Sequence, residues 1–242
     1  MEDLIEVKRV IEEADSIVFL GGAGVSTQSG IPDFRGSGGL YTTSHKSDDA
    51  PEGMLTKGCL YQTPEKFYQF YRNCMVYPDA KPNDAHFALA KLEDQGRLLA
   101  VITQNIDGLH QAAGCENVLE LHGSVRKNYC TKCGKFHSLA YLLCSEGVPT
   151  CIACGGMVRP DVVLYGEALD LDALMRAEDA VHNADVMIVG GTSLTVNPAA
   201  SLVNRYRGEH LIIINQMPTP YDCYAEYVIR EPIADVLRYL VG

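Results

Sequence analysis

Residues 16–27 read Ser-Ile-Val-Phe-Leu-Gly-Gly-Ala-Gly-Val-Ser-Thr, and this stretch decides the fold class. Its first five residues are mostly apolar without alternation, which is typical of a strand buried on both faces. The glycines predict a tight turn into a helix, where backbone N–H groups and the helix dipole favour a phosphate. The pattern departs from G-x-G-x-x-G, because Thr27 stands where the third glycine would be. By itself the stretch is equally compatible with a purely structural turn.

Similar apolar runs and helical patterns alternate along the rest of the chain. Further strands are predicted at residues 98–103, 118–121, 162–165, 186–189 and 211–214. Helices are predicted near residues 4–11, 82–95, 171–184, 198–206 and 232–239, the last beginning with Pro232 at its first position. This order predicts an α/β fold with a Rossmann-like, mostly parallel sheet and helices on both faces.

Two stretches interrupt the alternation of strands and helices. Residues 31–78 contain several glycines, a polar run and an aromatic helical segment, and residues 124–157 contain clustered cysteines. We interpret both as insertions that together form a smaller domain, part zinc ribbon and part helical. The Rossmann-like domain then comprises residues 1–30, 79–123 and 158–242.

The composition is that of an ordinary globular protein. The chain has 242 residues, enough for one or two domains with a large core. No apolar run reaches the roughly 18 residues of a membrane span. The N-terminus is acidic and shows no apolar leader, and nine cysteines, an odd number, fit a reducing compartment. We therefore expect a cytoplasmic protein with no membrane partner.

The net charge limits the choice of partners. The chain contains 20 Lys and Arg against 31 Asp and Glu, a formal charge of −11. Non-specific binding of nucleic acid needs a cationic face, so we expect no direct nucleic-acid partner. The charge is compatible with a cationic partner such as a lysine-bearing protein tail.

Four cysteines stand out by their spacing: Cys130 and Cys133, then Cys151 and Cys154. Two C-x-x-C pairs 17 residues apart are typical of a zinc ribbon. Four thiolates give a closed tetrahedral site, so the pattern predicts one structural Zn²⁺ rather than a catalytic metal. Coincidental or redox-active pairs are the alternative, and Cys144 is a spare thiol between them.

Polar residues follow two of the predicted strands, at the sheet edge where open α/β folds bind ligands. Residues 103–110 read Thr-Gln-Asn-Ile-Asp-Gly-Leu-His and supply amides and a carboxylate suited to a ribose and a carboxamide. A turn with a helix cap at Asp107 is the alternative interpretation. His122 ends the third strand and is a candidate general base, since an imidazole has a pKa of roughly 6.5. His110 is the rival, although we expect it to point along a helix.

Taken together and in order, these motifs resemble the sirtuin family of NAD-dependent protein deacylases, in its bacterial form. The resemblance covers nearly the whole chain and rests on residues 22–27, 30–35, 103–107 and 122–123, the two C-x-x-C pairs, residues 159–167 and 190–194, and Asn215. It implies that the Rossmann-like domain binds NAD as a consumed co-substrate. Residues 227–232 match no motif of the family, which leaves the adenine end of the site undefined.

The resemblance also implies roles for individual residues. His122 would be the general base, acting with Asn105. The cofactor-binding residues would be Gly22, Ala23, Gly24, Thr27, Asp33, Phe34, Arg35, Gln104, Asn105, Ile106, Asp107, Thr192, Ser193 and Asn215. The acyl-lysine substrate would contact Val163, Tyr165, Gly166 and Glu167 as an added strand, and also Tyr68.

The activity implied by the family is removal of an acyl group from lysine, formally an acyl transfer to ADP-ribose. Acyl-lysine, NAD and water would give lysine, nicotinamide and O-acyl-ADP-ribose, with acyl-lysine proteins or peptides as partners. Two alternatives are a protein mono-ADP-ribosyltransferase with the same NAD pocket and a non-enzymatic scaffold that depends on NAD or zinc.

The acyl preference depends on one helical segment. Sirtuins that prefer succinyl or malonyl lysine carry a Tyr-x-x-Arg pair there. In this chain Tyr68 is present, but Tyr71 occupies the Arg position. Arg72 comes one residue late, which a helix turns by about 100°. We therefore expect a preference for neutral acyl groups, acetyl first.

Overall fold

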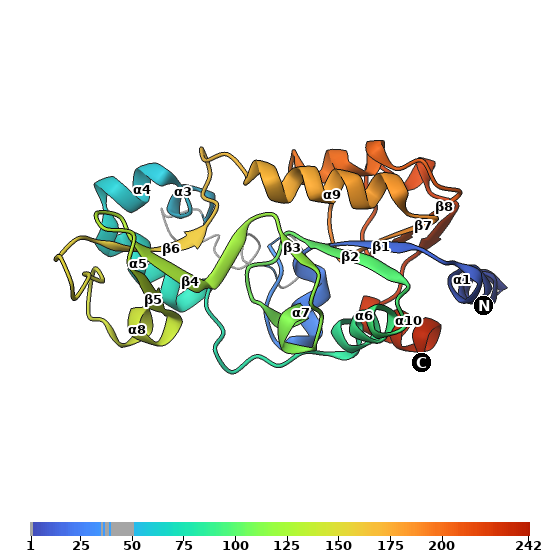
Figure 1. Ribbon diagram of the computed structural model, residues 1–242, viewed down its shortest axis with the longest axis horizontal. Helices are drawn as coiled ribbons and strands as arrows, with labels where there is room; N and C mark the ends of the chain where they lie inside the picture. The colour runs from blue at the N-terminus through green and yellow to red at the C-terminus, as the bar shows by residue number, and fades with distance from the viewer. Residues whose placement is uncertain (1, 35, 37–38, 40–50) are drawn as a thin grey trace.

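The computed structural model describes residues 2–34, 36, 39 and 51–242, which form two parts arranged side by side (Figure 1). The larger part is built on a six-stranded sheet in the order β3-β2-β1-β7-β8-β9, in which all neighbouring strands are parallel. Its strands are β1 (Ile17–Gly21), β2 (Leu98–Thr103), β3 (Val118–Glu120), β7 (Val186–Gly190), β8 (His210–Ile214) and β9 (Tyr227–Ile229).

Helices cover both faces of this sheet (Figure 1). Ile17 and Phe19 of β1 face a cluster formed with α1 (Glu2–Glu13), α6 (Asp84–Asp94) and α10 (Ile233–Val241). Val18 and Leu20 point the other way, toward α9 (Leu171–Asn183) and the 3₁₀ helix η2 (Ala199–Arg205). The predicted fold class, a mostly parallel Rossmann-like sheet with helices on both faces, is therefore confirmed.

The smaller part contains an antiparallel sheet in the order β5-β4-β6. Its strands are β4 (Gly123–Cys130), β5 (Phe136–Ser138) and β6 (Val158–Val162). Among the described residues, the helices that accompany it are α3 (Pro51–Met54), α4 (Lys57–Gln62), α5 (Pro64–Cys74) and α8 (Leu139–Cys144). Phe67, Tyr68 and Tyr71 of α5 form a separate apolar core with residues of β4 and β6.

One predicted strand is wrong. Residues 162–165 were expected to join the parallel sheet, but the strand β6 is Val158–Val162 and pairs antiparallel with β4. Its residues alternate between buried and more exposed positions, and Pro160 lies at its centre, so no continuous apolar run marks it. β6 also falls inside residues 158–242, which the sequence assigned to the larger domain. The division into two domains remains a proposal.

Two helices differ from expectation in detail. Residues 199–205 form a 3₁₀ helix rather than an α-helix, and Pro232 is the N-cap of α10 rather than its first position. The other short elements in the part of the chain that the structure describes are η1 (Ala23–Ser29), α7 (Leu109–Ala112) and η3 (Asp222–Tyr224). Within the described residues, none of the helices combines the length and the apolar character needed to cross a membrane.

Candidate active site

A cavity of about 820 Å³ opens at the carboxyl ends of β1, β2, β7 and β8, beside the junction with the smaller part. This is the edge at which open α/β sheets bind ligands, and the volume lies within the usual range for ligand pockets. The predicted residues that line the cavity are Gly22, Ala23, Gly24, Thr27, Asp33, Phe34, Gln104, Asn105, Ile106, Asp107, His122, Val163, Tyr165, Gly166, Glu167, Thr192, Ser193 and Asn215. Segments far apart in the sequence therefore meet at one site.

Two predicted residues are not placed at this cavity. Arg35 lies outside the described residues. Tyr68 is fully buried in the core of the smaller part, its hydroxyl donates to the backbone oxygen of Val158 at 2.5 Å, and it does not line the cavity. Tyr71, one helical turn later, lies on the cavity wall instead.

The glycine loop after β1 packs against the loop after β7. The backbone N–H of Gly24 donates to the backbone oxygen of Gly191 at 2.8 Å. A Cβ atom on Gly24 would lie 2.7 Å from the Cα atom of Gly191, so a side chain does not fit. The expected α-helix after this turn is the short 3₁₀ helix η1. The close approach leaves both loops with their backbones at the cavity.

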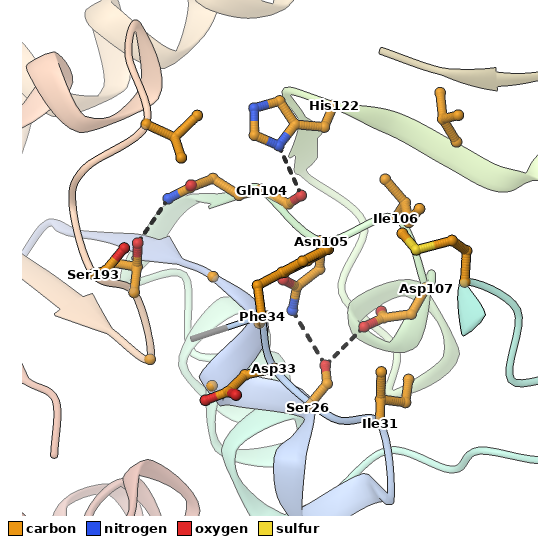
Figure 2. A pocket seen from close by; sticks show the side chains of 18 of the residues that line it. Ser26, Ile31, Asp33, Phe34, Gln104, Asn105, Ile106, Asp107, His122 and Ser193 are labelled. Atoms are coloured by element: carbon orange, nitrogen blue, oxygen red, sulfur yellow. Dashed lines mark hydrogen bonds between the residues drawn. The ribbon is translucent and has the colours of Figure 1, made fainter. Parts of the chain in front are cut away.

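A hydrogen-bond network lies in the wall of the cavity, with Ser26 at its centre (Figure 2). The Ser26 hydroxyl donates to Oδ2 of Asp107 at 2.7 Å and accepts from Nδ2 of Asn105 at 3.2 Å. The other carboxylate oxygen of Asp107 accepts from the backbone N–H of Leu109 at 2.8 Å. These bonds fix the orientation of Asn105 and Asp107. Ser26 was not singled out from the sequence, because only the fold brings it within reach of both.

The side chain of Gln104 joins two loops across the cavity. Its Nε2 atom donates to the Thr192 hydroxyl at 3.0 Å. The Thr192 hydroxyl in turn accepts from the backbone N–H of Leu194. The side chain of Thr192 is therefore already oriented within the chain.

A hydrogen bond to the loop Gln104–Asp107 fixes the tautomer of His122. Its Nδ1 atom lies 3.0 Å from the backbone oxygen of Gln104 (Figure 2). A carbonyl oxygen only accepts, so Nδ1 carries the proton and Nε2 keeps its lone pair. Burial lowers the pKa of His122, and the hydrogen bond to Gln104 opposes that shift. The imidazole is therefore neutral near pH 7, with an acceptor nitrogen on a cavity-lining side chain.

Gly123 explains how His122 reaches its position. Its φ is +75°, a left-handed conformation that favours glycine. A Cβ atom there would lie 2.0 Å from the backbone oxygen of Asp161 in β6. The chain thus turns sharply after His122 and enters β4 directly against β6, at the junction of the two parts.

Glu167 lines the cavity, and its carboxylate is engaged within the chain. Both of its oxygens accept from the Arg159 guanidinium, at 2.7 and 2.9 Å. One oxygen also accepts from the backbone N–H of Leu164 at 3.1 Å. The hydrogen bonds from Arg159 lower the pKa of the Glu167 carboxyl group. This pair holds the segment Val163–Gly166 in place along the cavity.

At the far end of the cavity, Arg230 organises the loop after β8. One guanidinium nitrogen donates to the backbone oxygens of Asn215 and Met217, at 2.9 and 3.2 Å, and another is paired with Asp222. Both loop residues line the cavity. Residues 227–232 match no motif in the sequence, so this role of Arg230 was not predicted. A lone Arg after a short strand gives no signal of which carbonyl groups it will contact.

Two more buried histidines lie behind the Asp107 loop. The rings of His86 and His110 are 4.7 Å apart, and both are at most 1% exposed. Burial lowers the pKa of each, so both are neutral near pH 7. His110 does not line the cavity, and among the described residues His122 is the histidine that does.

The four predicted cysteines form a cluster at the end of the smaller sheet. Their sulfur atoms all lie within 4.8 Å of one another, with Cys130 and Cys154 at 3.4 Å and Cys133 and Cys151 at 3.7 Å. In a tetrahedral site with Zn–S bonds of about 2.3 Å, the sulfur atoms are roughly 3.8 Å apart. The backbone N–H groups of Lys132 and Ala153 donate to two of these sulfurs. The donor set and its spacing therefore fit a structural Zn²⁺.

A parallel sheet with a ligand-sized cavity at its carboxyl edge, together with a four-cysteine cluster, is typical of an α/β protein with a ligand-binding edge and a metal module. A model of the Sir2 family matches residues 22–198. An NAD-dependent protein deacetylase of Clostridium perfringens is 51% identical over 243 residues, covering 100% of both chains.

Solved structures agree with this assignment. A Sir2 homologue in complex with NAD is 41% identical with a TM-score of 0.88, over 98% of this chain and 92% of that one. A Sir2 variant with a deacetylated peptide and 3′-O-acetyl-ADP-ribose is 40% identical with a TM-score of 0.88, over 98% and 96%. The chain belongs to the Sir2 family.

Proposed function

We propose that this chain is an NAD-dependent protein lysine deacylase, and primarily a deacetylase. The observation that carries the proposal is the convergence of His122, the loop Gln104–Asp107 and the glycine loop on one cavity. NAD, consumed as co-substrate, supplies the ADP-ribose group that accepts the acyl group. Full-length similarity to an NAD-dependent protein deacetylase supports the same activity.

His122 is the general base of this proposal. Its Nε2 atom holds the free lone pair, and the bond from Nδ1 to Gln104 fixes the ring. The lowered pKa keeps the base unprotonated at neutral pH, so a substrate hydroxyl near Nε2 can transfer its proton there. The carbonyl of Gln104 also stabilises the imidazolium that results.

Asn105, Ile106 and Asp107 form the pocket for the nicotinamide group. Asn105 is only 8% exposed, and the bonds through Ser26 give its amide a fixed direction. A carboxamide is recognised by such preorganised amide and carboxylate groups. Phe34 lies across the same cavity and excludes water from the reacting atoms (Figure 2).

The rest of the cofactor is bound by loops of the larger part. Backbone groups of Gly22–Gly24, together with Thr27, Thr192 and Ser193, are suited to phosphate oxygens and ribose hydroxyls. Asn215 binds the adenosine ribose. The acyl-lysine substrate pairs with the Val163–Gly166 segment as an added strand.

The proposed partners are proteins that carry acyl-lysine. The formal charge of −11 favours basic protein segments over nucleic acid, and we propose a cytoplasmic location. The structural zinc stabilises the smaller sheet, whose strand β4 begins directly after His122.

The test is incubation with NAD and an acetyl-lysine peptide. Mass spectrometry should find nicotinamide, free-lysine peptide and O-acetyl-ADP-ribose in equal amounts. Transfer of ADP-ribose to protein with the acetyl group intact would instead identify a mono-ADP-ribosyltransferase. NAD or zinc binding without any turnover would identify a scaffold.

A further inference from the structure

The outer face of the smaller sheet carries two exposed aromatic rings. Tyr129 of β4 and Phe136 of β5 are paired directly across the strands, and their exposed fractions are 37% and 53%. The ring centroids lie 5.8 Å apart, with the planes at 66° to each other. The opposite face of the sheet, with Asn128 and His137, is buried. A cross-strand aromatic pair stabilises a hairpin, but exposed apolar surface on a sheet face also marks sites of protein interaction.

Positive charge gathers around this aromatic pair. Residues 121–145 contain four of the chain's 20 Lys and Arg residues and none of its 31 Asp and Glu residues. Two of the four, Lys132 and Lys135, are exposed in the turn that joins β4 to β5. Neither is in an ion pair within the described part of the chain, whereas Lys127 is paired with Glu120 at 3.3 Å. The hairpin is therefore a local cationic surface on a chain whose formal charge is −11.

The zinc site supplies a structural reason for part of this charge. Four thiolates and one Zn²⁺ carry a net charge of about −2, which nearby lysines offset. Lys132 lies between Cys130 and Cys133, and its backbone N–H donates to the Cys130 sulfur at 3.4 Å. Charge balance at the metal accounts for lysines near the cluster. It does not account for the two exposed rings beside them.

Strand β6 connects this surface to the proposed substrate segment. Tyr129 is in register with Arg159 of β6, and the segment begins at Val163, four residues further along the chain. Four residues of strand span about 13 Å. A substrate chain that continues from the cavity along the smaller sheet therefore reaches the aromatic pair within a few residues.

We propose that Tyr129, Lys132, Lys135 and Phe136 form a docking surface for an acidic segment of the protein substrate, separate from the acyl-lysine itself. Carboxylates of that segment pair with the lysines, and its apolar side chains contact the rings. Nucleic acid fits this surface less well, because the rest of the chain is strongly acidic and repels phosphates. The inference rests on the proposed deacylase function and deepens it by naming a second feature of the preferred substrates.

The test measures kcat/KM for one acetyl-lysine peptide with three kinds of tail. The peptide is used alone, with a run of glutamates, or with an equal run of glutamines, attached at either end. A Gly-Ser linker of about eight residues has a root-mean-square length of roughly 16 Å, which matches the distance along β6. We expect the glutamate tail to raise kcat/KM about three- to tenfold over the glutamine tail, through KM, the size of two exposed ion pairs. The gain should disappear at about 1 M salt.

Two variants with the same change of charge locate the effect. Lys135→Glu should abolish the gain from the glutamate tail, whereas Lys66→Glu, at an exposed position of α5, should keep it. Phe136→Ser should lower the gain about twofold, through loss of one partly exposed apolar contact. All three variants should process the peptide without a tail as the wild type does. Equal rates for the two tails in the wild type, or a gain that survives Lys135→Glu, overturn the proposal.

Metal analysis and a competitor separate docking from the other roles of this surface. Lys135→Glu should keep one equivalent of zinc. Loss of zinc and of turnover of the peptide without a tail would assign Lys135 to the metal site, which overturns the proposal. A single-stranded oligonucleotide that displaces the glutamate tail better than a free glutamate peptide of equal charge would assign the surface to nucleic acid, which also overturns it. Failure of the deacylase function is a different result, since no form of the acetyl peptide would then be processed.

Discussion

The two sheets of this protein are stabilised in different ways. The six-stranded sheet lies between two large apolar clusters, and the central residues of β1 and β7 are fully buried. The three-stranded sheet has exposed Tyr129 and Phe136 on one side, and the four cysteines gather at its end. We expect burial of apolar surface to be sufficient for the first sheet. The second sheet has an apolar core of its own, and we expect it to depend in addition on the metal ion that its four cysteines fit. The active site lies between them, so both kinds of stability bear on activity.

Removal of the metal should have the largest effect on structure and activity. We expect that effect to begin as unfolding of the smaller part. A structural Zn²⁺ contributes on the order of 10 kcal/mol of apparent free energy in small zinc modules. We expect a chelator, or Cys151→Ser, to unfold β4–β6 and abolish activity while the parallel sheet persists. Hydrogen exchange and metal analysis measure this. Cys144→Ser, an exposed cysteine outside the cluster, is the control and should keep one equivalent of zinc. A metal-free protein with full activity would contradict the claim that the smaller sheet depends on the metal ion.

A substitution that leaves a cavity in the core of the larger part should destabilise the six-stranded sheet. Ile188 in β7 is fully buried between its neighbours. Ile188→Ala should lower the free energy of unfolding by about 2–5 kcal/mol, with zinc content unchanged. Chemical denaturation measures the loss. Ile5→Ala, the same change at a side chain that is 63% exposed, should stay within about 0.5 kcal/mol. Equal losses from the two changes would deny that burial holds this sheet.

Arg230 should affect cofactor binding without affecting chemistry. Arg230→Met leaves the carbonyl groups of Asn215 and Met217 without their donor. We expect KM for NAD to rise about tenfold, the size of one or two hydrogen bonds, with kcat nearly unchanged. Arg230→Lys should restore part of the affinity, and Arg207→Met, at an exposed site away from the cavity, should change neither constant. A fall in kcat with KM unchanged would place Arg230 near the reacting atoms instead.

The smallest expected effect is a shift in the pH dependence of kcat/KM. Burial lowers the pKa of His122, so the neutral base persists to lower pH than a free imidazole would. The acid limb of kcat/KM should therefore lie below the ordinary histidine value of about 6.5. An acid limb above that value would indicate a protonated, more solvated His122.

Much of this site was predictable because its residues lie in loops that directly follow apolar strands. Strand ends of a parallel sheet meet at one edge, so His122 and Asn105 could be placed together from the sequence alone. The predictions failed where contacts between distant segments decide the outcome. Ser26 is the centre of a network only because Asp107 comes within 2.7 Å of its hydroxyl.

The helix α5 shows a second limit of the sequence. Tyr68 and Tyr71 are both aromatic and both buried, so the pattern could not tell which of them faces the cavity. Which tyrosine faces the cavity depends on the position of β6. That strand was not predicted, because its residues alternate between buried and more exposed positions. The difference matters, because one hydroxyl is bonded to that strand and the other is not.

The most direct test of the account is a comparison of the wild type with His122→Ala, using NAD and one acetyl-lysine peptide. His122 occupies the junction of the two parts without forming the core of either, so the variant should keep its zinc and its melting temperature. We predict that the wild type releases nicotinamide and free-lysine peptide in a one-to-one ratio. The variant should form the free-lysine peptide about a hundredfold more slowly or worse, the scale of general-base loss. A folded, zinc-bound His122→Ala that deacetylates at nearly the wild-type rate would contradict the central claim.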